Sequence, residues 1–255
     1  MEISLEQHLR DYAASFLNGQ PENDQNIRLK LAHSFRVRNE AKSIAEAELT
    51  DNTLRTIAEQ TALLHDLSRF EQFARFGTFN DLLSFDHGDR AAELVAEQHL
   101  LDDLTEVDRN DAIAAIRCHN KLTIPDTLSV QGVILAKIVR DADKIDIMPI
   151  LFDYLKHPTN KSVVHNLAIS NELSPAIWEA LSKRRLPPNS KISSTIDFIA
   201  SKLNWVYDLN YPTSRQIFRD RGYLETLREF LPNTPQVNTI YYAASSWLTN
   251  IDKKE

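Results

Sequence analysis

Cysteine and glycine are both scarce in this chain of 255 residues, which contains 1 cysteine and 5 glycines. A single cysteine excludes an internal disulfide framework and fits a reducing compartment. Glycine weakens helix interiors, so its scarcity, together with an apolar fraction of 42%, is typical of a mostly helical protein. The length is sufficient for one large apolar core.

Long apolar runs and an excess of positive charge are missing as well. The apolar run within QGVILAKIV is far too short to span a bilayer, and the start MEISLEQHLR lacks the apolar core of a signal peptide. A net charge of −7 and a pI near 5.6 argue against general nucleic-acid binding, which requires basic stripes, but leave room for a local basic pocket. We therefore expect a cytoplasmic protein that binds neither a membrane nor a nucleic-acid polymer. The sequence is compatible with an oligomer.

Helical periodicity dominates the chain, and no strand pattern persists for more than a few residues. Residues 26–49 are predicted to form one long amphipathic helix after a loop over residues 18–25, and residues 76–85 to form a loop with a short turn. We predict an all-α fold. Residues 1–150 would form a helical core that carries the site, and residues 151–255 a C-terminal helical extension packed on it, together one compact unit.

Several ionisable residues lie on the apolar sides of predicted helices. His33, His65, His119 and Asp143 belong to four separate helices, and a fifth helix begins at or near His87. Taken alone, each is better explained without a metal: the histidines as hydrogen-bonded core residues, and Asp143 as a helix-end carboxylate in an ion pair. Burying all of them unpaired would cost several kcal/mol, which a divalent cation compensates, because imidazoles and carboxylates are common metal ligands. The pattern indicates one metal site, or two that share a carboxylate.

With Asp66 beside His65, this ordered set resembles the HD-domain metal-dependent phosphohydrolase superfamily, in its H…HD…H…H…D order. The surrounding segments resemble a bacterial-type branch of small stand-alone HD proteins: HSFRVRNEAKSIAEAE, LLHDLSRFEQFARFGTFND, SFDHGDRA, AIRCHNK and IVRDADKIDI. The resemblance covers about residues 26–148, extends weakly into WVYDLNYP at 205–212, and implies an HD-domain helical bundle. Ser68 departs from the glycine that this branch tends to carry, so the turn there is expected to differ slightly.

The resemblance implies two divalent metal ions held by six ligands: His33, His65, Asp66, His87, His119 and Asp143. Asp66 would bridge the two ions. His33, His65 and Asp143 would complete the first site, and His87 and His119 the second. Iron or manganese is expected, although nickel, cobalt, zinc and magnesium are compatible with such ligands. Asp143 is favoured over Asp141 and Asp146 by the motif and by its apolar side of the helix.

The implied reaction is hydrolysis of a phosphoester or phosphoanhydride of a small metabolite, a nucleotide being the expected class, through a metal-bound water. The expected catalytic residues are Asp66, Arg69 and Lys144. The residues expected to bind substrate are Arg69, Asn120, Lys121, Lys144, Tyr207 and Asn210. Each of the substrate-binding residues is alternatively a surface or core residue. Asp86 either orients the imidazole of His87 or caps its helix.

Two other functional classes share these features. myo-Inositol oxygenase and a related phosphonate-cleaving oxygenase use a similar ligand order around two irons, so the ligands alone do not separate hydrolysis from oxygen chemistry. Arg69 and Lys144 favour hydrolysis because they suit an anionic substrate. A non-catalytic HD binding or regulatory module is a third possibility, although such modules commonly lose a ligand and this chain retains all six.

Overall fold

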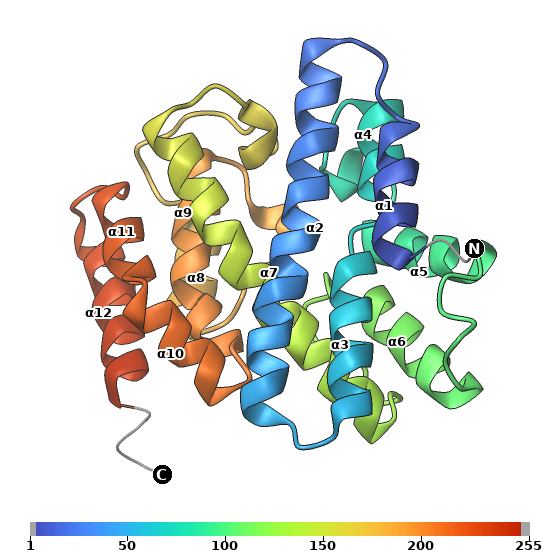
Figure 1. The fold of residues 1–255 in the computed structure, drawn as a ribbon. Helices are drawn as coiled ribbons and strands as arrows, with labels where there is room; N and C mark the ends of the chain where they lie inside the picture. The colour runs from blue at the N-terminus through green and yellow to red at the C-terminus, as the bar shows by residue number, and fades with distance from the viewer. Residues whose placement is uncertain (1–3, 251–255) are drawn as a thin grey trace. The chain divides into compact units, whose positions relative to one another are not determined.

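The computed structural model describes residues 4–250, and the chain divides into two compact units, Met1–Asp146 and Ile147–Glu255. Within the described residues the secondary structure consists of α-helices and short 3-10 helices, with one isolated bridge and no β-sheet (Figure 1). The predicted all-α fold is confirmed. The boundary expected at residue 150 and the expected packing of the extension on the core stay predictions.

The first unit carries all six predicted metal ligands. Its elements are α1 (Leu5–Ala14), α2 (Pro21–Glu48), α3 (Asn52–Leu64), α4 (Arg69–Phe76), η1 (Asp81–Leu83), α5 (His87–Glu97), α6 (Glu106–Cys118) and the first part of α7 (Val130–Lys156). α7 continues past Asp146 into the second unit.

Helix α2 begins earlier than predicted, at Pro21 rather than at residue 26. Proline suits the first helical position, where its missing N–H would have no helical partner. Glu22 and Asp24 in the first turn favour the positive end of the helix. Asp24 also accepts a hydrogen bond from the Asn18 backbone at 3.0 Å, which closes the preceding loop. His33 therefore lies in the interior of α2, away from both ends of the helix.

Three predicted ligands lie at helix ends. His65 is the C-cap of α3, His87 is the first residue of α5, and His119 is the C-cap of α6. Asp51 starts α3 by accepting backbone hydrogen bonds, and Asp86 does the same for α5. The Asp86 cap therefore fixes the helix end that carries His87.

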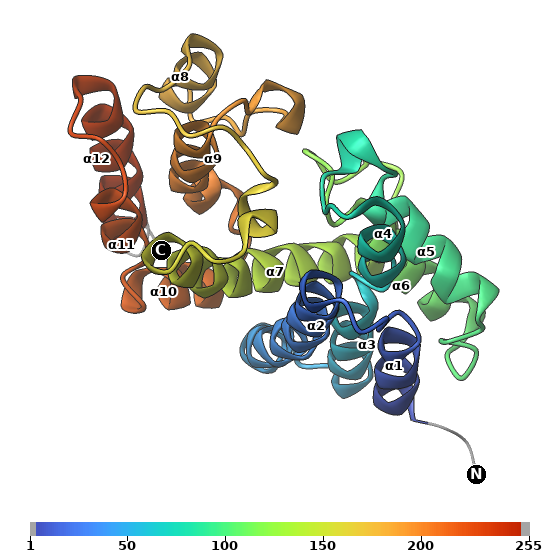
Figure 2. The same cartoon turned by 90° about the horizontal axis from the view of Figure 1, so that it is seen from above.

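The apolar core of the first unit holds α2 and α3 side by side and antiparallel, and α3 packs on α6, which lies beside α5 (Figures 1 and 2). Val37 and Ile44 of α2 and Ile57 and Leu64 of α3 are essentially inaccessible to solvent. Each such side chain contributes about 1.5–3 kcal/mol when fully buried. The core thus sets the spacing from which the polar residues of these helices face one another.

The second unit is also helical. Its elements are the end of α7, η2 (Lys161–Val164), α8 (Pro175–Ser182), η3 (Asn189–Lys191), α9 (Thr195–Ser201), η4 (Lys202–Asp208), α10 (Pro212–Asp220), α11 (Tyr223–Glu229) and α12 (Pro235–Asn250). η4 packs against α9, α11 and α12, and Leu203 and Val206 are buried there. Among residues 4–250, no helix combines the length and apolar character needed to cross a membrane.

Gly88 gives a test of the α5–α6 packing. A Cβ at this position would lie 2.5 Å from Asn120 Oδ1 and 2.8 Å from the Arg117 carbonyl oxygen. Because the carbonyl belongs to the backbone, α5 would have to move. We expect Gly88→Ala to lower the free energy of unfolding by about 1–3 kcal/mol, measured by urea denaturation.

Gly132→Ala is the matched control, because its Cβ would meet only side-chain atoms, Asp111 Oδ1 at 3.1 Å and Ser129 Oγ at 3.4 Å. These side chains can rotate away. A loss of stability in Gly132→Ala equal to or larger than that in Gly88→Ala would contradict the tight α5–α6 contact.

Candidate metal centre

Two of the histidines are oriented by the backbone. His65 Nδ1 lies 2.7 Å from the Ala62 carbonyl oxygen, and His119 Nδ1 lies 2.7 Å from the Ile116 carbonyl oxygen. A carbonyl oxygen only accepts hydrogen bonds, so each Nδ1 must carry the proton. The lone pair of each ring is therefore on Nε2, which is the usual arrangement of a metal-ligating histidine.

The other two histidines are oriented by carboxylates. His33 Nδ1 lies 2.7 Å from Asp146 Oδ2, and His87 Nδ1 lies 2.5 Å from Asp81 Oδ2. Burial raises the pKa of Asp81, but His87 and Arg69 outweigh it and hold the pKa below its usual range, so the carboxylate is ionised. It accepts the Nδ1 proton, so the lone pair of the His87 ring is on Nε2, the atom that would bind a cation.

The first donor group consists of His33 Nε2, His65 Nε2, Asp66 Oδ2 and Asp143 Oδ1. His33 Nε2 lies 3.4 Å from the Asp66 oxygen and 3.1 Å from the Asp143 oxygen. His65 Nε2 lies 3.6 and 3.7 Å from the same two atoms. Both ring nitrogens are buried, and neither has a hydrogen-bond partner among the described residues. Orphaned buried nitrogens beside two carboxylates fit a bound cation.

The electrostatic surroundings of His33 favour positive charge at this place. Burial and Lys30 lower the pKa of His33, but the adjacent carboxylates of Asp143, Asp146 and Asp66 outweigh them and raise it to about 10. A cation at Nε2, whether a proton or a metal ion, is therefore stabilised by the protein.

The second donor group consists of Asp66 Oδ1, His87 Nε2 and His119 Nε2. The two ring nitrogens are 3.1 Å apart and lie 3.6 and 3.8 Å from the Asp66 oxygen, respectively. Burial, together with the neighbouring rings of His87 and His65, lowers the pKa of His119 to about 3, so its ring is neutral at pH 7. Two facing lone pairs are brought together here, an arrangement that a cation stabilises.

Asp66 joins the two donor groups, because each of its oxygens faces a different one. Burial raises the pKa of this carboxyl, but Lys30, His65 and Arg69 outweigh it and hold the pKa well below the usual range. Two sets of side chains bring donor atoms within 4.8 Å of one another: His33, His65 and Asp143, and His65, Asp66 and His119. The six ligands expected from the sequence thus lie together.

Two basic side chains contact the Asp66 carboxylate. Lys30 Nζ lies 2.7 Å from Oδ2, and Arg69 Nε lies 3.3 Å from Oδ1. Arg69 Nη1 also donates to Gln72 Oε1 at 2.6 Å and to the Phe79 carbonyl oxygen at 2.7 Å. Arg69 is therefore held beside the donor atoms, and its expected catalytic and substrate-binding roles stay predictions.

Comparison with known families agrees with this geometry. The family model described as the HD domain matches residues 31–148, a span that contains every residue of both donor groups. Residues 31–148 form an HD domain. The predicted superfamily is confirmed, and HD domains are usually metal-dependent hydrolases. No curated protein and no solved structure matches the chain.

The donor chemistry of this HD domain fits divalent cations. Imidazole nitrogens and carboxylate oxygens suit Mn, Fe, Co, Ni and Zn. Each of the four imidazoles has a hydrogen-bond partner at Nδ1, which directs its Nε2 toward the donor group. The residues that would hold the ions are those of the two donor groups. The number and identity of the ions stay predictions.

Asn120 and Lys121 contact the start of α5. Asn120 Nδ2 donates to Asp86 Oδ1 at 2.9 Å and lies 3.3 Å from Asp81 Oδ2. Lys121 Nζ lies 2.6 Å from Asp86 Oδ2. Asp86 caps α5, whereas Asp81 pairs with the imidazole of His87, so the capping alternative describes Asp86. Whether Asn120 and Lys121 bind substrate stays a prediction.

The remaining predicted substrate residues have other neighbours. Lys144 Nζ donates to the Arg140 carbonyl oxygen at 3.3 Å. Tyr207 and Asn210 belong to the second unit, where the Tyr207 ring packs edge-on against Trp247. Asn210 Nδ2 donates to the Asp208 carbonyl oxygen at 3.2 Å. The expected substrate contacts of these residues stay predictions.

Ser68 shows how the HD domain accommodates the departure noted in the sequence. Its backbone has φ −73° and ψ −13°, a right-handed conformation that needs no glycine. The buried Oγ donates a hydrogen bond to the His87 carbonyl oxygen at 2.8 Å. The serine therefore ties the turn after Asp66 to the start of α5.

Three residues of the centre were not identified from the sequence: Lys30, Asp81 and Asp146. Lys30 precedes His33 by three residues and Asp146 follows Asp143 by three, so each shares a helix face with a ligand. That spacing was an available signal, although Asp146 is weighed above only as an alternative ligand. Asp81 lies beyond a loop without periodicity, and its role depends on tertiary contacts alone.

The bridging role of Asp66 predicts different losses of metal from two variants. Asp66→Ala should lose both ions, because each of its oxygens serves one donor group. His119→Ala should lose only the ion of the second donor group. Metal analysis after reloading with manganese in the presence of inorganic phosphate measures both. His99→Asn serves as control because His99 is exposed and its φ of 56° is tolerated by asparagine. Equal metal contents in Asp66→Ala and His99→Asn would contradict the assignment.

The orienting carboxylates predict a second separation. Asp81→Ala should weaken binding of the second ion by about 10–100-fold, because His87 loses the acceptor that fixes its ring. Asp146→Ala should weaken binding of the first ion in the same way through His33. Manganese titration against a competing chelator measures both affinities, and each variant is the control for the other. The same pattern of loss in both variants would contradict the two-group arrangement.

Proposed function

We propose that this HD domain is a metal-dependent phosphohydrolase with two divalent ions, which cleaves a phosphoester or phosphoanhydride of a small metabolite. Nucleotides are the substrate class that we propose to test first. One observation carries the proposal: the two oxygens of Asp66 face separate donor groups, while Lys30 and Arg69 bring positive charge to the same carboxylate. A bridged pair of cations next to buried basic side chains suits a phosphoryl group.

Divalent ions, when bound, would lower the pKa of water and neutralise charge on the phosphoryl oxygens. Iron and manganese are the ions that we propose. The donor groups contribute by holding four imidazoles in a single tautomer, each with Nε2 directed inward. Because these orientations exist before substrate arrives, little free energy is spent on ordering them during the reaction.

Arg69 and Lys30 are the proposed phosphate-binding residues. A guanidinium presents planar N–H donors that match two phosphate oxygens, whereas an ammonium acts as a compact point charge. Their side chains are only 10% and 13% exposed, so their attraction for an anion is less screened than at the surface. Gln72, Asp81 and the Phe79 carbonyl hold Arg69 in position.

The proposed reaction forms a bond between a water oxygen and phosphorus and breaks the bond from phosphorus to the leaving oxygen. The leaving oxygen keeps the bonding electron pair and takes up a proton, and the phosphoryl group retains its negative charge. Lys144, Asn120 and Lys121 are proposed as further groups around the phosphate. Tyr207 and Asn210 are proposed to contact the base or sugar of a nucleotide.

A substrate panel tests the proposal. The manganese-loaded protein should release phosphate from, or cleave, at least one member of a panel of nucleotides and sugar phosphates, followed by phosphate assay and chromatography. Asp66→Ala should show no turnover, whereas His99→Asn should keep it. The iron-loaded protein is assayed in parallel for oxygen consumption with the same compounds.

The other outcomes identify the alternatives. Oxygen consumption without phosphate release would support the di-iron oxygenase alternative and refute hydrolysis. A protein that binds both ions yet turns over no compound in either assay would instead support a binding or regulatory module.

A further inference from the structure

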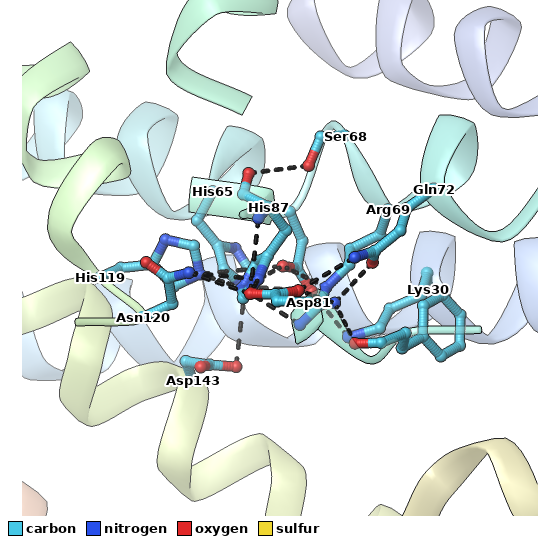
Figure 3. Close-up of polar contacts among 12 residues, drawn as sticks. Lys30, His65, Ser68, Arg69, Gln72, Asp81, His87, His119, Asn120 and Asp143 are labelled. Carbon is cyan, nitrogen blue, oxygen red and sulfur yellow. Dashed lines mark hydrogen bonds and ion pairs between the residues drawn. The ribbon is translucent and has the colours of Figure 1, made fainter. Parts of the chain in front are cut away.

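The guanidinium of Arg69 lies directly on the second donor group. Its Nη2 is 3.1 Å from Nε2 of His87, the neighbouring side chain in Figure 3. Its Nε is 3.3 Å from Asp66 Oδ1. These are two of the atoms that would bind the second ion. A positively charged side chain and a divalent ion repel each other strongly at such distances inside a protein. Arg69 and the ion therefore cannot both occupy these contacts.

The first donor group has a different environment. Lys30 contacts the Asp66 carboxylate there, at Oδ2. The ring nitrogens His33 Nε2 and His65 Nε2 have no hydrogen-bond partner among the described residues. An ion entering the first donor group thus has to displace Lys30 from one carboxylate oxygen only. An ion entering the second has to displace Arg69 from an imidazole nitrogen as well as from a carboxylate oxygen.

The contacts of Arg69 divide between its two sides. Nη1 is anchored by Gln72 Oε1, by the Phe79 carbonyl oxygen and by Asp81 Oδ1 at 3.2 Å. Nε and Nη2, which face the donor atoms, form the edge of the guanidinium that binds two oxygens of a phosphate. A small rotation about the anchored nitrogen would transfer this edge from the donor atoms to a phosphate.

We propose that Arg69 competes with the second cation for Asp66 Oδ1 and His87 Nε2, and that a phosphate group relieves this competition by binding the Nε–Nη2 edge. The inference rests on the metal centre of the proposed function. It makes loading of the centre sequential: the first ion binds by itself, and the second ion binds together with the anionic substrate. Two bound ions would then coexist mainly when a substrate is present.

Manganese titration of the chelator-treated protein, with and without inorganic phosphate, tests the competition. Arg69→Gln should bind the second ion roughly tenfold or more tightly than the unmodified protein in the absence of phosphate, because a competing positive charge is gone. Binding of the first ion should change little. Phosphate should tighten the second ion in the unmodified protein and do so less in Arg69→Gln. The His119→Ala isotherm identifies the first ion.

Arg75→Gln is the matched control. Arg75 belongs to the same helix, α4, but its side chain is 61% exposed and pairs with Glu71 at 2.6 Å. Its replacement should leave both manganese affinities unchanged. A gain in Arg75→Gln equal to that in Arg69→Gln would mean that general charge, not contact with the donor atoms, is responsible, and would overturn the inference.

The remaining outcomes separate this inference from the proposed function. Unchanged or weaker second-ion binding in a folded Arg69→Gln variant would overturn the competition while leaving the metal centre in place. Failure of the unmodified protein to bind any manganese would overturn both. If Arg69→Gln does not fold, judged by circular dichroism, the unmodified protein decides: second-ion binding that phosphate does not change would refute the proposal.

Discussion

The buried carboxylate of Asp66 is the constraint on which the rest of the first unit depends. An ionised carboxylate away from water costs several kcal/mol unless opposite charges and hydrogen-bond donors surround it. Lys30 and Arg69 supply the opposite charge, and the ring nitrogens of four histidines close around the remaining directions. The long helix α2, the capped starts of α3 and α5 and the apolar contacts between α2 and α3 position these groups around a single residue.

The four histidines are secured in two physically different ways. Backbone carbonyls orient His65 and His119, so no side-chain substitution outside these residues removes their acceptors. His33 and His87 depend on the side chains of Asp146 and Asp81. Each donor group contains one histidine of each kind. In each group, one imidazole donates to a backbone carbonyl of its own helix, and the other donates to a carboxylate that the tertiary structure brings close. Substitutions in the orienting layer can therefore alter one group separately from the other.

The helical fold could be predicted because apolar residues recur at helical spacing through nearly the whole first unit. The ligand set came from the ordered histidines and acids and from their resemblance to a known family, since spacing alone does not show that five helices meet. Helix α2 begins before the predicted residue 26, because the polar stretch that resembles a loop has Pro21 at the first helical position. Asp81 could not be identified, because only the fold brings its loop to His87 and Arg69. Lys30 lies at helical spacing from His33, but its pairing with Asp66 joins α2 to the turn that follows α3, which only the fold brings together.

Three proposed ligands lie at helix termini: His65 is the C-cap of α3, His87 is the first residue of α5 and His119 is the C-cap of α6. Helix termini are where local opening normally starts, because their last backbone groups have no helical partners. Bound ions would fasten together three termini that are far apart in the chain. Their departure would release fraying at all three at once, so backbone amide exchange near these residues would report metal occupancy more sensitively than global unfolding does. The presence or absence of bound ions would then determine how often these helix termini open.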